Sequence, residues 1–242
     1  AGKSIIRRAP KIASAIVIVS LALSFGISLS IFINTYQTQK STDARYSLGS
    51  DIKVTIASGI HQQPAAFAQM IEQVSGVTAA SPVQLSQAYV GSTLQNVYGI
   101  DPQTYVNASD MPDSYFVNIS ANQAMADMAS IQNGALVSEE MAKAYDIVPG
   151  DPIIISLANT ATVNGPTVET RLQVVGIIRF FPTATNDTFV VMNQNFMQTI
   201  TRNDKISYFL VRTSASPHDV AASIQDKLGS QVSMKTEDID TA

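Results

Sequence analysis

The hydrophobic pattern of the chain opens with one long apolar run. Residues 12–33 carry no charge, and thirteen of these twenty-two residues are Leu, Ile, Val or Phe. A helix of this length spans about 33 Å, enough to cross the roughly 30 Å hydrocarbon core of a bilayer. The alternative is a cleavable signal peptide, which has a shorter apolar region and a small-residue cleavage site. No such site follows Ile33, so the pattern predicts a retained transmembrane helix.

Two stripes of small residues recur every four positions in this predicted helix and lie on nearly opposite faces. Small residues at this spacing let helix backbones approach one another closely in lipid. The stripes therefore predict a helix that packs against neighbouring membrane helices on both sides. They consist of Ser20, Ser24 and Ser28 on one face and of Ala22, Gly26 and Ser30 on the other.

The charges that flank the run predict its orientation. Residues 1–11 contain four charged side chains, all of them basic, whereas the first acidic residue of the chain is Asp43. Because basic flanks stay in the cytoplasm, we expect residues 1–11 to be cytoplasmic and the chain after Asn34 to be extracytoplasmic. Residues 34–49 are polar, lack proline and have their single glycine at the end, which predicts a helical stalk. The basic residues are Lys3, Arg7, Arg8 and Lys11.

Beyond the stalk, the pattern changes to short strands and one helix. Residues 52–56 alternate between apolar and polar, as in a strand. Pro64 starts a helical pattern that ends at Ser75-Gly76, and further strands are predicted around 83–90 and 94–100. The apolar face of the helix consists of Phe67, Met70, Ile71 and Val74.

The same order of elements returns near the C-terminus. Residues 206–212 are a predicted strand, and Ser216 followed by Pro217 is typical of a helix start. Gly229 ends this helix, and residues 232–234 form a short strand.

Two strand–helix–strand units make a ferredoxin-like fold, with both helices on one face of an antiparallel sheet. We therefore expect residues 50–102 and 204–242 to form one α/β lobe, with 103–203 as an inserted, mainly β lobe. The predicted fold class is α+β: one transmembrane helix followed by a two-lobed extracytoplasmic domain. The elements predicted in the insertion are a helix over 138–145, strands over 153–157, 168–178 and 189–192, a tight turn at Asn164-Gly165 and a helix over 194–201.

Charge and residue types exclude several classes of function. Eleven of the fifteen basic residues and all nineteen acidic residues follow Asn34, so this part carries a net charge near −8. An acidic domain without a basic cluster is a poor partner for nucleic acid. The chain has no cysteine and two histidines, and we expect no metal site and no cofactor. Ser216, His218 and Asp219 have the residue types of a hydrolase triad, but neighbours at a helix start cannot form its relay, and we expect a helix cap and no catalytic residue.

One apolar run stands out in the insertion. Phe180-Phe181-Pro182 follows the long predicted strand. If exposed, it could dock a partner protein or an acyl chain; if buried, it ends the strand. We expect burial.

Four segments together resemble the extracytoplasmic domain of FtsX-like, MacB-type ABC transporter permeases. They are GIDPQTY (99–105), GALVSEEMAKAYDIVPGDPIII (134–155), LQVVGIIRFF (172–181) and FVVM (189–192). The order and spacing of these segments carry the resemblance, which covers essentially the whole chain. The residues that match the family pattern are Gly99, Asp101, Pro102, Ser138, Ala142, Gly150, Asp151, Val175 and Gly176, and Pro149 departs from it at a position that is usually aliphatic.

The resemblance implies a permease part that has no catalysis of its own. It further implies three more membrane helices after this domain, a cytoplasmic ATP-binding subunit, a second permease copy and, in some members, an extracytoplasmic partner protein. ATP-driven movement of the membrane helices would then move the outer domain. The alternative from another class is a single-pass sensor or receptor whose domain binds a ligand; an ectoenzyme is a more distant alternative.

Overall fold

The computed structural model describes residues 2–57, 62–158, 167–229 and 232–239. The turn predicted at Asn164-Gly165 lies outside the described residues. The chain divides into two units, Ala1–Asp43 and Ala44–Ala242, which are described separately.

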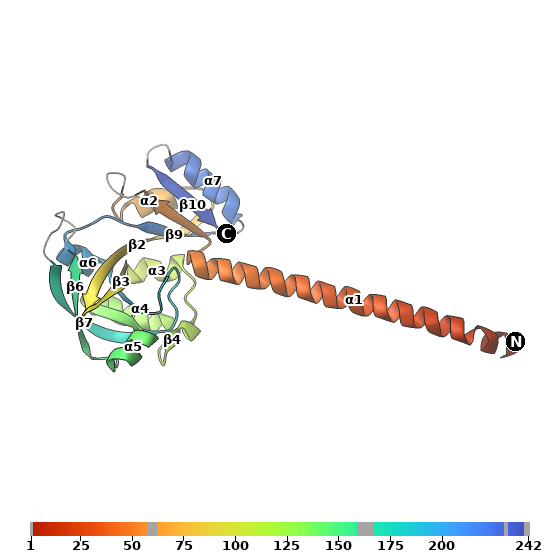
Figure 1. The fold of residues 1–242 in the computed structure, drawn as a ribbon. Coiled ribbons are helices and arrows are strands. Elements are labelled where there is room, and N and C mark those ends of the chain that lie inside the picture. The colour runs from red at the N-terminus through yellow and green to blue at the C-terminus, as the bar shows by residue number, and fades with distance from the viewer. Residues whose placement is uncertain (1, 58–61, 159–166, 230–231, 240–242) are drawn as a thin grey trace. The chain divides into compact units, whose positions relative to one another are not determined.

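Helix α1 (Gly2–Leu48) makes up the first unit as far as Asp43 (Figure 1). Its last five residues belong to the second unit. Residues Ala13–Tyr36 of α1 are long and apolar enough to cross a membrane. Their side chains are exposed throughout, as expected of a helix whose apolar surface meets lipid or other helices.

Among the described residues of the second unit, ten strands join in one sheet. Its order is β10-β1-β9-β2-β3-β8-β5-β7-β4, and β6 pairs with both β2 and β7. The pairs β3–β8 and β5–β7 are parallel, and all others are antiparallel. The strands are β1 (Ile52–Ile56), β2 (Val77–Val90), β3 (Thr93–Ile100), β4 (Phe116–Val117), β5 (Gly134–Ser138), β6 (Pro152–Ala158), β7 (Thr167–Ile178), β8 (Phe189–Asn193), β9 (Tyr208–Thr213) and β10 (Met234–Asp238).

Helices α2 (Phe67–Glu72) and α7 (Pro217–Leu228) share one core with β1 and β9 (Figure 1). Ile71 of α2 and Ile224 of α7 are fully buried there. Helix α7 begins as predicted, because the Ser216 hydroxyl caps the backbone N–H of Asp219. Helix α2 starts three residues later than predicted, because Pro64 pairs with Lys205 in a β-bridge instead.

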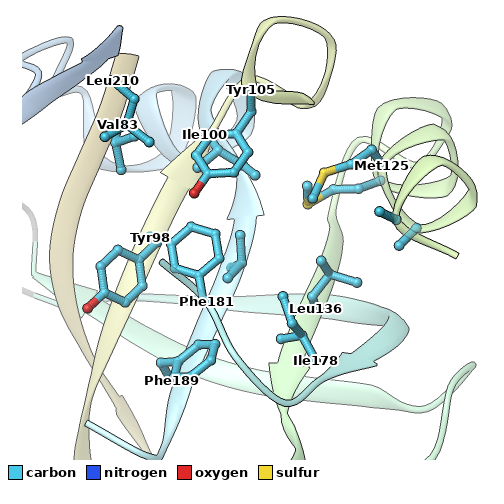
Figure 2. Close-up of a cluster of buried hydrophobic side chains, with 14 of the residues drawn as sticks. Val83, Tyr98, Ile100, Tyr105, Met125, Leu136, Ile178, Phe181, Phe189 and Leu210 are labelled. Carbon is cyan, nitrogen blue, oxygen red and sulfur yellow. The ribbon is translucent and has the colours of Figure 1, made fainter. Parts of the chain in front are cut away.

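A second core lies around Phe181 (Figure 2). Its ring stacks on Tyr105 at 5.5 Å between centroids and lies 5.0 Å from Tyr98 and 6.0 Å from Phe189. Burial raises the pKa of Tyr105 well above its ordinary value, so this phenol stays neutral. Helices α3 (Pro102–Ala108) and α4 (Ala121–Ser130) supply Tyr105 and Met125 to this core.

The third core forms beneath helices α5 (Glu139–Tyr145) and α6 (Gln194–Thr201). Met141 of α5 and Met197 of α6 pack with apolar side chains of β5, β6, β7 and β8. The ends of both helices match the prediction, because Ser138 and Asn193 supply N-cap oxygens to backbone N–H groups.

The α+β class is confirmed, but the segment 103–203 is more helical than predicted. Its described residues hold four α-helices besides five strands. Helices α3 and α4 had not been predicted, and the buried face of α4 consists of alanine and methionine. One sheet runs through both predicted lobes, so the lobe boundaries at 102/103 and 203/204 stay a prediction.

Two neighbouring phenylalanines give a matched test of this core. Phe181 is 0% exposed and Phe180 is 49% exposed. Phe181→Ala should lower the free energy of unfolding by about 3–5 kcal/mol through a buried cavity. Phe180→Ala should cost roughly 1 kcal/mol, because it removes only partly exposed ring contacts. Urea unfolding of the detergent-solubilised chain, followed by near-UV circular dichroism, measures both; equal losses would contradict the inward placement of Phe181.

Candidate functional site

Outside the cores, the segment with the most specific contacts is Ala44–Asp51, between the last turn of α1 and the start of β1. We call it the anchor segment. Leu48 and Asp51 are 6% and 5% exposed. The helix ends at Gly49, which has φ +83°, a left-handed conformation that glycine adopts without steric cost. A Cβ at Gly49 would lie 3.0 Å from Thr183 Cγ2 and 3.2 Å from Pro182 Cβ. The anchor segment therefore fits closely against the loop after β7.

Ion pairs hold the anchor segment from one side. The guanidinium of Arg45 lies 3.3 Å from the carboxylate of Asp51 and 3.1 Å from that of Asp110. Asp110 also binds Arg212, at 2.5 Å, and Asp51 accepts a hydrogen bond from the Thr213 backbone N–H at 3.0 Å. Arg45 thus joins the last turn of α1 to the start of β1 and to the segment after α3.

Aromatic rings hold the anchor segment from another side. The ring of Tyr46 lies edge-to-face with Tyr115 and with Phe180, at 6.2 Å between centroids in both pairs. Tyr115 and Phe180 also contact each other, at 5.8 Å. Such edge-to-face geometry is favourable beyond simple burial.

The loop after β7 is tied to the same turn through Thr183. Its backbone N–H donates to the carbonyl oxygen of Tyr46 at 3.3 Å, and its hydroxyl lies 2.5 Å from the Tyr208 hydroxyl. Thr183 has φ +71°, which is strained for a β-branched residue. The surrounding contacts keep it in this conformation, as is common where a loop has a functional position.

Buried hydroxyl groups complete the anchor segment. The Ser50 hydroxyl lies between the carbonyl oxygens of Ala108 and Val211, and the Ser109 hydroxyl donates to the Gly49 carbonyl oxygen at 2.7 Å. These bonds fasten the anchor segment to the end of α3 and to β9. With the bond from Thr183, the anchor segment is connected to three parts of the second unit: the end of α3, strand β9 and the loop after β7.

The residues that match the family pattern around β3 serve local structure. The Asp101 carboxylate caps α3 by accepting from the Gln103 backbone N–H at 3.0 Å, and Pro102 is at the first helical position. A Cβ at Gly99 would lie 2.8 Å from the Met197 sulfur, so a larger residue there would require the Met197 side chain of α6 to shift.

The matching residues around α5 and β7 likewise make caps and turns. Ser138 accepts from the backbone N–H groups of Met141 and Phe189, both at 3.2 Å. Gly150 has φ +101°, and the Asp151 carboxylate closes that turn by accepting from the Val148 N–H at 2.9 Å. A Cβ at Gly176 would lie 3.1 Å from Leu136, so β5 and β7 pack closely there.

The expectation for the Phe180-Phe181-Pro182 run is half right. Phe181 and Pro182 are buried, whereas burial was wrong for Phe180, which is exposed and contacts Tyr46. The run follows the end of β7 at Ile178, and the chain there buries Phe181 and Pro182 while Arg179 and Phe180 stay exposed.

The predicted membrane residues lie in α1 and are not tested by these contacts. The two small-residue stripes are exposed in the first unit, and a Cβ built on Gly26 would meet nothing within 4 Å apart from its chain neighbours and the nearby backbone of α1. The side chains of the basic flank, Lys3, Arg7, Arg8 and Lys11, lie outside the described side chains.

The described residues form no group of three or more His, Asp or Glu side chains that could hold a metal ion. Ser216 is the N-cap of α7, and His218 pairs with Asp238 at 3.4 Å between nitrogen and oxygen. The helix cap that the sequence predicted at Ser216 is confirmed.

Sequence reasoning missed the anchor contacts because they are non-local. Arg45 and Asp110 are 65 residues apart, and Asp110 and Arg212 are 102 apart. A local signal did exist: a basic residue in the last helical turn, followed by Gly49, is typical of a helix terminus. It marks where the helix ends but not which carboxylates meet Arg45.

Comparisons with known proteins agree with this fold. Residues 14–229 match the family described as the MacB-like periplasmic core domain. The periplasmic region of MacB from Actinobacillus actinomycetemcomitans is 14% identical, with a TM-score of 0.51, over 81% of this chain and 92% of that one. The extracellular domain of the noncanonic ABC-type transporter YknZ from Gram-positive bacteria is also 14% identical, with a TM-score of 0.49, over 77% of this chain and 99% of that one. No curated protein matches the chain.

The family match covers most of the chain, including most of the apolar part of α1. It is in keeping with a chain that has a candidate membrane helix and a sheet-rich domain. The chain therefore belongs to the MacB-like periplasmic core domain family, in agreement with the resemblance that its sequence carries.

Proposed function

We propose that this chain is a permease part that couples ATP hydrolysis on a separate cytoplasmic subunit to movement of its extracytoplasmic domain. The observation that carries the proposal is the anchor segment. Helix α1 includes both the apolar stretch Ala13–Tyr36 and the anchor residues Ala44–Leu48. A displacement of the apolar stretch would therefore reach the domain through helix rather than through a flexible linker.

The part of α1 between these stretches supports a stiff connection. Residues 37–43 contain neither glycine nor proline, the residues that most weaken a helix. Gln39 and Asp43 also form a hydrogen bond of 2.7 Å between side chains one turn apart, which adds a small local stabilisation.

In this proposal the basic flank stays in the cytoplasm and the second unit is extracytoplasmic. The small-residue stripes of α1 would pack against the further membrane helices of the permease and a second permease copy. The bilayer and a cytoplasmic ATP-binding subunit are then the partners, with an extracytoplasmic partner protein in addition. Export, lipoprotein or lipid handling and transmembrane signalling are uses that fit such coupling.

The orientation can be tested by labelling, because the chain has no cysteine of its own. Ala222→Cys lies on an exposed position of α7, and Ser4→Cys lies in the basic flank. A membrane-impermeant maleimide should label Ala222→Cys in intact cells and Ser4→Cys only after permeabilisation. If only Ser4→Cys were labelled in intact cells, the orientation would be the opposite of the one proposed.

The coupling can be tested by changing the stiffness of α1. A flexible insertion of seven residues, all glycine or serine, between Gln39 and Lys40 should abolish coupled transport in the intact assembly. ATP hydrolysis and folding of the domain should stay as in the wild type. A seven-residue helix-forming insertion of Ala, Glu and Lys is the matched control, because it adds the same length and turns the helix by only about 20° from its phase. Full transport with the flexible insertion would favour a tethered ligand-binding or sensor domain.

The anchor itself can be tested at Arg45. Arg45→Ala leaves the buried carboxylate of Asp51 without its cation, and should lower the free energy of unfolding by about 1–2 kcal/mol. Arg45→Lys should restore part of this loss, because an ammonium cannot span both Asp51 and Asp110 as the guanidinium does. Lys205→Ala, which removes a surface pair with Asp204, is the control. Transport per ATP hydrolysed should fall in the order wild type, Lys, Ala; unchanged coupling in Arg45→Ala would refute a role for the anchor.

A further inference from the structure

A pocket of about 380 Å³ opens beside the anchor segment, wholly within the second unit. This volume lies in the range of small-molecule sites, roughly 300–1,000 Å³. Tyr46, Phe180 and Phe189 supply its aromatic lining. Its charged lining consists of Glu139, Glu140, Arg179 and Asp187.

The aromatic side of the pocket presents rings that are only partly covered. Tyr46 is 36% exposed and Phe180 is 49% exposed. The two rings meet edge-to-face, with 83° between their planes, and both line the pocket. The face of an aromatic ring carries partial negative charge and attracts a cation. An apolar group would also lose contact with water against Phe180.

The pocket lining has three carboxylates and one cation, and Lys143 outside the lining supplies a second cation. Glu139 is paired with Arg179 at 3.2 Å, and Lys143 lies 2.9 Å from Glu140. Asp187 makes no ion pair with any described residue. Its charge reaches the aromatic side: burial first, and then the Asp187 carboxylate, raise the pKa of Tyr46. The pocket therefore combines aromatic faces with an unbalanced negative charge.

We propose that this pocket binds an organic cation, a ligand with an ammonium group on an apolar stem. The ammonium group lies toward Asp187 and the ring of Tyr46, and the stem lies against Phe180. A neutral ligand would gain only the apolar contact, and an anion would be repelled by the unpaired carboxylate. The cation can come from a small amine or from a lysine side chain of a peptide, since both carry the same group. Binding at this site does not depend on the coupling function proposed above.

The test is calorimetric titration of the full chain in phosphatidylcholine nanodiscs, with empty nanodiscs as the blank. The probes are phenethylammonium, the capped dipeptide acetyl-Phe-Lys-amide and the neutral 2-phenylethanol. Phenethylammonium should bind with a Kd on the order of 1 mM, and 2-phenylethanol at least about threefold more weakly. Raising the salt concentration from 50 to 500 mM should weaken the binding of the cation but not of the alcohol.

Variants locate the site. Asp187→Asn and Phe180→Leu should each weaken phenethylammonium about two- to fivefold, whereas Asp226→Asn, an exposed carboxylate on α7, should leave it unchanged. Both pocket positions are exposed, so circular dichroism should show an intact fold. Binding of the dipeptide as well assigns the site to peptide side chains, and binding of phenethylammonium alone assigns it to small amines. Equal affinity for 2-phenylethanol, an unchanged affinity in Asp187→Asn, or no binding of either cation overturns the proposal.

Discussion

The placement of Phe181 constrains much of the second unit. Its ring fills the space between Tyr98, Tyr105 and Phe189, which come from β3, α3 and β8 (Figure 2). Phe180 directly precedes Phe181, so fixing this ring in the core also confines Phe180 to the adjoining surface, where it is 49% exposed. There Phe180 meets Tyr46 of the anchor segment. Core packing thus determines where the last turn of α1 finds its aromatic contact and where the wall of the pocket stands.

The anchor segment combines contacts that resist different movements. The ion pairs of Arg45 oppose separation of the helix end from Asp51 and Asp110, but they are partly solvated and each is modest in energy. The edge-to-face rings oppose rotation, because turning Tyr46 would lose the contacts with Tyr115 and Phe180 together. The close approach at Gly49 leaves no room for a sideways shift toward Thr183. The anchor segment would therefore be stiff although no single contact in it is strong.

The sequence predicted best those elements whose ends carry local signals. Helices α5, α6 and α7 each start at a capping side chain, Ser138, Asn193 or Ser216, and these hydrogen bonds form within a few residues. Helix α4 was missed although Ser120 caps it and its buried residues recur at helical spacing, because that spacing is carried by alanine and methionine rather than by large branched or aromatic side chains. Strand β2 begins six residues before the predicted start, since its first residues are held by β9, a pairing that no local pattern encodes.

The contacts of the anchor segment and the pocket could not be predicted from the sequence, for a related physical reason. Asp101, Gly150 and Asp151 were recognised from a family pattern in the sequence, and their roles are local turns and caps. Arg45, Tyr46, Asp110 and Asp187 act through partners that only the fold brings near, and a single arginine or aspartate on a polar stretch looks like a solvated surface residue. Thr183 shows the limit most clearly: its strained φ of +71° contradicts the preference of its own side chain. The contacts with Tyr46 and Tyr208 hold it there, so tertiary structure overrides local preference at the same place where the domain receives α1.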